Sequence, residues 1–272
     1  MPRLAETSGD LPASPHPFGA AYAGSEESSR PGGAMADAAS VSLLCLPHAG
    51  AGASFFTSWA GLVGIPVHLM PMQLPGREER IDEEPYRDVL SAVRTLESDF
   101  AGRSPRPDRV ALFGHSFGSV LAFELARRLE SRPGVEVVRL FASGSPGPSA
   151  PRARRAAGLD DDAFLDRVQE FAGYRHPAFD IPELRSLLLP ALRADVLAHE
   201  EYAPVCEAPI QAPITCFRGG DDHLVSVEDA AGWRSSTAGG FELVELPGGH
   251  MYLVEQAKFL LACILERLTV EP

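Results

Sequence analysis

The chain has 272 residues, of which 45% are hydrophobic and 22% charged, and its formal net charge is −13 at pH 7. This composition fits a globular protein with a substantial core, and so negative a charge argues against nucleic acid or an anionic membrane as a partner. No apolar run is long enough to cross a membrane, and the N-terminus lacks the basic and apolar regions of a secretory signal. We therefore expect a cytoplasmic protein whose four cysteines are free thiols.

Residues 1–40 are rich in Pro, Ser, Gly and Ala without apolar periodicity, which predicts a disordered leader. After them, apolar runs typical of buried strands alternate with helical patterns. The alternation predicts a mostly parallel sheet with helices on both faces. The expected strands are residues 41–46, 67–72, 109–113, 135–142, 214–217 and 242–246, and the expected helices are 54–62, 86–100, 119–129, 226–235 and 253–268.

A stretch of about 55 residues interrupts this alternation between the fourth and fifth expected strands. It contains two helical patterns, residues 161–171 and 182–199, and no strong strand signal. Helices inserted above the strand ends indicate a lid and not a second domain. The sequence therefore predicts one domain over residues 41–272, with a lid insertion at about 146–202.

The motif with the most specific chemistry is Gly114-His115-Ser116-Phe117-Gly118, which lies between an expected strand and an expected helix. A turn from strand to helix this tight leaves no room for side chains at the two glycines, and it exposes the serine on strained backbone. The free N–H groups at the start of the helix also favour a developing negative charge. The context therefore favours a nucleophile elbow, with Ser116 as nucleophile, over a chance serine in a glycine-rich turn.

A base and its acid are expected after the serine in chain order. His250 is the predicted base, because Pro247-Gly248-Gly249 lets its loop bring the imidazole over the sheet edge. Asp222, in the glycine turn after residues 214–217, is predicted to orient that imidazole. Asp221 is the alternative acid, although we expect it to face solvent or cap the next helix. His115 is expected to pack or hydrogen-bond locally.

The reaction also requires hydrogen-bond donors for an oxyanion. One predicted donor is the backbone N–H of Phe117, directly after the nucleophile. The other comes from the loop Pro47-His48-Ala49-Gly50 after the first expected strand, where we assign Ala49. The alternative for that loop is a simple glycine-rich turn. Neither a metal ion nor a soluble cofactor is required by this set of residues.

These motifs occur together with Gln73-Leu74-Pro75-Gly76-Arg77 and Trp233-Arg234, in order and at suitable distances. With them, residues 41–270 resemble the type II thioesterases, the stand-alone α/β-hydrolase thioesterases of polyketide and nonribosomal peptide synthesis. The resemblance implies hydrolysis of stalled or incorrect acyl groups from the phosphopantetheine arm of an acyl or peptidyl carrier protein, in antibiotic biosynthesis. It assigns Ser116, Asp222 and His250 the roles given above.

Two features depart from that family pattern. Met251-Tyr252 follow the histidine where the family often has aromatic residues, and the leader has no counterpart in the family. We expect a monomer. Arg152, Arg154 and Arg155 form either a solvated face or a docking patch for an acidic carrier protein or its phosphate. The loop Gln73–Arg77 is expected to buttress the site, and substrate contact is its alternative role.

Three other functions remain open from the sequence. A medium-chain fatty acyl-carrier-protein thioesterase would share these motifs and this mechanism. A small-molecule carboxylesterase or lipase is disfavoured because the loop after the first strand is Pro-His-Ala-Gly and not of the His-Gly-Gly-Gly type. A noncatalytic binding protein of the same fold is disfavoured by the complete set of Ser116, Asp222 and His250.

Overall fold

A computed structural model describes residues 41–62, 67–152, 155–172 and 177–269. The chain divides into two units, residues 1–37 and 38–272. The expected leader lies outside the described residues, so every structural statement below concerns the second unit. The cysteines are free thiols, as expected. Within the described ranges, no helix has the length and apolar character needed to cross a membrane.

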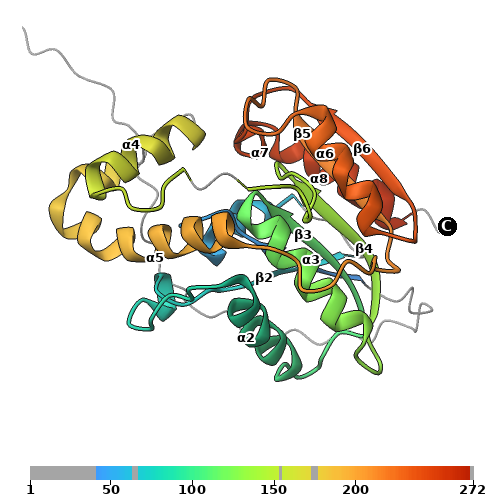
Figure 1. Cartoon of the computed structure of the whole chain (residues 1–272). Helices are drawn as coiled ribbons and strands as arrows, with labels where there is room; N and C mark the ends of the chain where they lie inside the picture. Colours follow the sequence, from blue (N-terminus) through green and yellow to red (C-terminus); the bar gives the residue numbers. More distant parts are fainter. Residues whose placement is uncertain (1–40, 63–66, 153–154, 173–176, 270–272) are drawn as a thin grey trace, which may run out of the picture. The chain divides into compact units, whose positions relative to one another are not determined.

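Six strands form one sheet in which every pair of neighbours is parallel (Figure 1). Their order across the sheet is β2-β1-β3-β4-β5-β6, which confirms the expected parallel sheet. Because all strands run the same way, the loops that follow them lie at one edge of the sheet, where sites of parallel sheets form. The strands are β1 (Val41–Leu46), β2 (Val67–Pro71), β3 (Arg109–His115), β4 (Glu136–Ser143), β5 (Ile214–Gly219) and β6 (Phe241–Leu246).

Helices cover both faces of the sheet because side chains alternate along each strand. Leu44 and Leu112 belong to a buried cluster with α2 (Val89–Ala101) and α3 (Phe117–Glu130). Their neighbours Leu43 and Phe113 belong to a cluster on the opposite face. That second cluster includes Trp59 of α1 (Thr57–Ala60), Leu253 of α7 (Tyr252–Glu255) and Leu261 of α8 (Ala257–Thr269).

The helix expected over residues 226–235 is shorter than the sequence pattern indicates. The α-helix α6 (Val227–Ala231) gives way to a 3-10 turn, η4 (Gly232–Ser236). A Cβ atom on Gly147 would lie 2.7 Å from the carbonyl carbon of Gly232, so two backbone segments approach closely there. Trp233 also donates its indole N–H to the Ser145 carbonyl at 2.9 Å. These long-range contacts explain the tighter backbone.

The insertion between β4 and β5 is helical, as expected, and contains α4 (Asp161–Ala172), η3 (Pro177–Asp180) and α5 (Pro182–Glu201). In Figure 1, α4 and α5 lie together beside the sheet. They share a small apolar cluster of their own, which Ala49 of the domain joins. The members of the cluster that are fully buried are Ala156, Phe164, Leu165, Leu189 and Leu192.

Candidate active site

The turn between β3 and α3 holds Ser116 on strained backbone. Its φ is 53° and its ψ is −116°, a conformation that residues with a side chain rarely adopt. A Cβ atom on Gly114 would lie 2.0 Å from the Gly118 carbonyl oxygen, and one on Gly118 would lie 2.3 Å from the Leu46 carbonyl oxygen. Both glycines are therefore required by contacts of the turn with itself and with β1.

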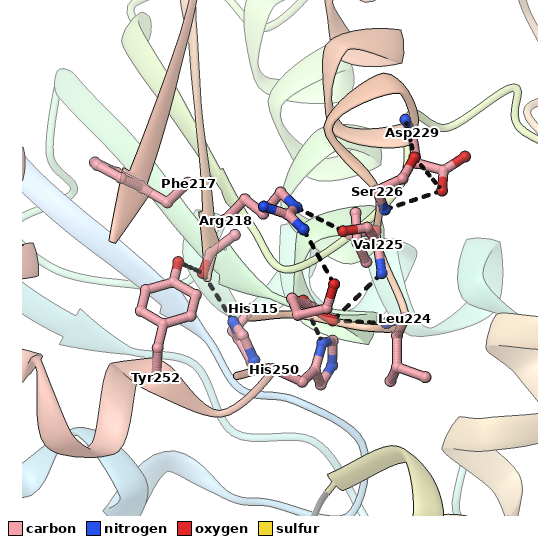
Figure 2. Close-up of polar contacts among 12 residues, drawn as sticks. His115, Phe217, Arg218, Leu224, Val225, Ser226, Asp229, His250 and Tyr252 are labelled. Carbon is pink, nitrogen blue, oxygen red and sulfur yellow. Dashed lines mark hydrogen bonds and ion pairs between the residues drawn. The ribbon is translucent and has the colours of Figure 1, made fainter. Parts of the chain in front are cut away.

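Asp222 and His250 are hydrogen-bonded to each other (Figure 2). The Asp222 Oδ2 atom lies 2.9 Å from the His250 Nδ1 atom. The other oxygen, Oδ1, accepts the amides of Leu224 at 2.8 Å and Val225 at 3.3 Å. Both carboxylate oxygens are thus occupied, and among the described residues the Nε2 atom of His250 has no hydrogen-bond partner.

The pKa of Asp222 reflects opposing effects. Burial alone would raise it, but the hydrogen bond and charge of His250 lower it, as do the two amides, and the net pKa lies below its usual value. The carboxylate therefore stays ionised at neutral pH. Asp221, the alternative acid, is exposed to solvent. It does not cap the next helix, since Ser226 does so in a capping box with Asp229.

The loops that carry the acid and the base are joined through their backbones. Gly220 donates its amide to the Leu246 carbonyl at 2.7 Å, and Asp221 donates to the Gly248 carbonyl at 2.9 Å. A Cβ atom on Gly219 would lie 2.4 Å from the Gly249 carbonyl oxygen, and Gly248 has a φ of 112°. The glycines of both loops are therefore what allows the two side chains to meet.

Arg218, at the end of β5, is hydrogen-bonded to the turn that carries Asp222, residues 219–225 (Figure 2). Its Nε atom donates to the Val225 carbonyl at 2.7 Å and its Nη2 atom donates to the Asp222 carbonyl at 3.1 Å. The same guanidinium pairs with Glu245 of β6. The sequence analysis did not single out this residue.

Three histidines lie near His250, of which His115 is buried and His48 and His199 are half-buried, and desolvation keeps them neutral. Burial lowers the pKa of His48 to about 4, with a smaller contribution from the charge of His250. The pKa values of His115 and His199 are well below the usual value, again chiefly through burial. His115 hydrogen-bonds locally, as expected, through Nδ1 to the Ser143 hydroxyl at 2.8 Å. Of these four histidines, only His250 has a carboxylate hydrogen-bonded to its ring.

A cavity of about 330 Å³ brings the predicted residues to one place. Ser116, His250 and Ala49 line it, together with Leu192 and His199 of α5. Among the described residues the Ser116 hydroxyl has no hydrogen-bond partner, and the bond between a catalytic serine and its histidine often forms only with substrate bound. The cavity is thus bounded by the sheet edge on one side and by α5 on another.

Two backbone N–H groups near Ser116 are free to donate. Within the described part of the chain, the amides of Ala49 and Phe117 have no hydrogen-bond acceptor. The amide of Gly50, by contrast, donates to Asp195 of α5 at 2.8 Å. In the loop after β1, the amide of Ala49 is therefore available to a ligand, whereas the amide of Gly50 is not.

The loop Gln73–Arg77 buttresses the loop after β1. The Gln73 Oε1 atom accepts the Ala53 amide at 2.8 Å. Arg77 is buried, donates to the Ala51 carbonyl at 3.1 Å and forms an ion pair with Asp195. The expectation of a supporting role for this motif agrees with these contacts.

Arg152 does not belong to the expected surface patch. Arg152 is largely buried and lines the cavity; its Nη1 atom lies 2.6 Å from the His199 Nε2 atom, and its guanidinium stacks over the Tyr202 ring at 5.2 Å. Burial lowers the pKa of Arg152 to about 10. Arg155 is exposed, and Arg154 lies outside the described residues. The prediction that Arg152 lies in a solvated surface patch is therefore wrong.

Two polar residues of α5 reach the site although the sequence analysis gave them no such role. Asp195 and His199 are polar residues of the insertion, where a charge or an imidazole is usually solvated. They follow Leu192 at spacings of three and seven residues, however, which places them on the apolar face of the helix. Polar residues on that face are the signal that could have identified them.

Comparison with known proteins gives the family. The family model described as "Thioesterase domain" matches residues 41–268. Thioesterase PikA5 of Streptomyces venezuelae is 38% identical over 219 residues, covering 79% of this chain and 76% of that protein. The gramicidin S biosynthesis protein GrsT of Aneurinibacillus migulanus is 33% identical, covering 80% of this chain and 85% of that protein.

A solved structure agrees in fold. The RedJ thioesterase from the prodiginine biosynthetic pathway in Streptomyces coelicolor superposes with a TM-score of 0.76 at 32% identity, covering 88% of this chain and 91% of that one. Together with the parallel sheet, this likeness confirms the expected α/β-hydrolase fold. The chain therefore belongs to the thioesterase family, as a serine-type α/β-hydrolase that acts on thioester bonds.

Proposed function

We propose that the chain is an editing thioesterase, which hydrolyses stalled or incorrect acyl groups from the phosphopantetheine arm of acyl or peptidyl carrier proteins in a polyketide or nonribosomal peptide pathway. The observation that carries this proposal is the shared cavity of Ser116, His250 and the free Ala49 amide, with Asp222 behind the imidazole. The names of similar proteins support the pathway class, because they refer to gramicidin S biosynthesis, to the prodiginine biosynthetic pathway and to a type II thioesterase of an NRPS/PKS biosynthetic pathway.

The proposal gives each residue a catalytic role that the geometry supports. His250 takes the proton of Ser116 through its Nε2 atom, and the serine oxygen attacks the thioester carbonyl. The amides of Ala49 and Phe117 stabilise the oxyanion. His250 then gives the proton to the leaving thiol, which departs as the free pantetheine arm. Water enters, loses a proton to the same imidazole and attacks the acyl carbonyl. The ester bond to Ser116 then breaks, the serine oxygen takes the proton back from His250, and the acyl group leaves as a carboxylic acid.

The proposed catalytic residues all belong to one copy of the chain, and a separate carrier protein delivers the substrate. Every residue assigned a catalytic role belongs to a single copy of the protein, so we infer that a monomer is sufficient for turnover. The cavity of about 330 Å³ is closed on one side by α5, which leaves room for an acyl group next to Ser116. The carrier protein itself stays outside, and its flexible arm delivers the thioester.

Substitution of the nucleophile tests the proposal. We expect Ser116→Ala to lower kcat on an acyl-loaded carrier protein by several orders of magnitude, on the order of 10⁶-fold, because the covalent route is lost. Circular dichroism and the melting temperature should stay close to wild type, and a serine-directed fluorophosphonate should label only the wild type. Turnover near the wild-type rate by this variant would remove Ser116 from the mechanism.

A panel of acyl groups separates the remaining candidates. Carrier proteins loaded with acetyl, propionyl and longer acyl chains should be hydrolysed with a preference for the short, incorrect groups. A preference for chains of medium length would instead indicate a fatty acyl thioesterase. Turnover of simple esters without any activity on carrier-bound thioesters would indicate a carboxylesterase.

A further inference from the structure

Arg77 and Asp195 form an ion pair in the interior of the protein, next to the loop after β1. The two side chains are only 3% and 5% exposed. The contact is bidentate, with Nη1 at 2.5 Å from Oδ2 and Nη2 at 3.0 Å from Oδ1. Buried ion pairs contribute little to stability compared with apolar residues of the same size. The pair is therefore better explained by what it holds in place.

The pair holds the loop after β1 from two sides. Asp195 accepts the Gly50 amide at 2.8 Å, while Arg77 donates to the Ala51 carbonyl at 3.1 Å. Arg77 is fixed in turn by its bond to the Pro75 carbonyl at 3.1 Å. The Ala49–Gly50 and Ala51–Gly52 peptide planes thus have defined partners, and the Ala49 N–H belongs to the plane that precedes the first of them.

Helix α5 lies directly on this loop. Gly50 has a φ of 77°, and a Cβ atom there would lie 2.8 Å from the Cδ1 atom of Leu192. Leu192 is on the same helix as Asp195, one turn earlier. The helix that covers the cavity therefore also supplies the acceptor for the Gly50 amide.

We propose that Asp195 is a positioning residue that couples the placement of α5 over the cavity to the geometry of the oxyanion loop. This inference rests on the proposed role of the Ala49 amide. With α5 in place, the Gly50 amide is held by Asp195 and the Ala49 N–H is held toward Ser116. When α5 moves away, the Gly50 amide loses its acceptor, the Ala49–Gly50 peptide is free to rotate, and the oxyanion loses a well-placed donor. Rapid acylation thus requires that α5 lie over the bound acyl group.

Two double variants isolate this effect. Arg77→Met with Asp195→Asn removes both charges but keeps an oxygen acceptor for the Gly50 amide. Arg77→Met with Asp195→Leu removes the charges and the acceptor, with a side chain of similar size. Because neither variant leaves a buried charge unpaired, we expect both to fold with similar melting temperatures.

The kinetic readout is kcat separated from KM on a small acyl-pantetheine thioester. We expect the Asn-containing variant to keep kcat within a few-fold of wild type and the Leu-containing variant to lose it on the order of 10²-fold, with little change in KM. Asp161→Ala is the matched control, since it breaks an ion pair with Arg193 at 2.7 Å between α4 and α5 that touches no residue of the loop. Its kcat should be unchanged.

Hydrogen exchange of the backbone amides of residues 48–52 tests the same coupling without turnover. The Gly50 amide should be protected in wild type and in the Asn-containing variant, and should exchange faster in the Leu-containing one. Equal protection and equal kcat in the two double variants, or a loss that follows the melting temperature, would overturn the inference. A wild type without thioesterase activity would instead overturn the proposed function, and the exchange data would still decide on the coupling.

Discussion

Asp222 shows how one side chain can fix the tautomer and the orientation of another. Its Oδ1 atom accepts two amides, from Leu224 and Val225, while its Oδ2 atom faces His250. The amides require an oxygen acceptor, so the position of Oδ1 is fixed by the backbone. The atom that faces the imidazole is therefore determined before any substrate binds.

This asymmetry makes Asp222→Asn a sharp test at the residue scale. The introduced side chain must keep its oxygen on the two amides, which turns its NH2 group toward the Nδ1 atom of His250. The Nδ1 atom must then accept, the proton moves to Nε2, and the imidazole can no longer take a proton from Ser116. We expect a loss in kcat on the order of 10⁴-fold with the fold intact, measured by thioester hydrolysis and circular dichroism. A loss of less than tenfold would mean that Asp222 does not orient the base.

At the scale of the element, α6 is a short helix whose N-terminus is stabilised by a capping box. Ser226 accepts the Asp229 amide at 3.0 Å, and the Asp229 carboxylate accepts the Ser226 amide at 3.1 Å. Such a capping box satisfies two N–H groups that a helix of five residues would otherwise leave exposed. It thereby defines where the acid turn ends and the helix begins.

Removal of this cap should reduce stability and spare the chemistry. We expect Ser226→Ala to lower the free energy of unfolding by about 1 kcal/mol, measured by urea denaturation, with kcat close to wild type. Ser235→Ala is the control, because that exposed hydroxyl bonds only to the Gly232 carbonyl within the same turn. An equal loss of stability in both variants would contradict the assigned role of the cap.

The elements show how far sequence reasoning extends. The strands and their parallel arrangement could be predicted, because a buried strand carries a continuous apolar run and because helices separate the strands. The end of α6 could not be predicted, since it depends on the contact of Gly147 with Gly232, 85 positions away in the chain. Local patterns contain no information about such a contact.

The candidate site divides in the same way. Sequence reasoning could propose Ser116, Asp222 and His250 as site residues. Each of them lies in a turn with a glycine that a close backbone contact or a positive φ requires. Asp195 could not, since an acid in a helix of an insertion is usually solvated, and its partner Arg77 is 118 residues away. Arg152 was assigned to the surface for the same reason, because its burial depends on His199 and Tyr202.

For the molecule as a whole, the three histidines near His250 link stability to pH. His48, His115 and His199 all have folded-state pKa values below the usual 6.5. The unfolded chain therefore binds protons that the folded chain does not, once the pH falls below about 6.5. Their contribution to stability is complete above that pH and is lost as the pH decreases.

The slope of this dependence can be measured. We expect the free energy of unfolding to fall between pH 6.5 and pH 4, by about 1.4 kcal/mol per pH unit for each histidine that titrates. His48→Phe should reduce this slope by up to about 1.4 kcal/mol per pH unit, the contribution of one proton. The reason is that the introduced phenyl ring fills the site without titrating. Urea denaturation at several pH values gives both slopes, and identical slopes would show that His48 is not held neutral.

The tie between α5 and the loop after β1 also bears on engineering. The segment between β4 and β5 forms one side of the cavity, so it is the natural part to exchange when a chimaera with altered acyl preference is wanted. Because Asp195 lies in that segment while Arg77 and Gly50 do not, a graft that lacks an acid at this position would leave a guanidinium and an amide without their acceptor. Chimaeras built at this boundary should therefore retain the aspartate, whatever else is replaced.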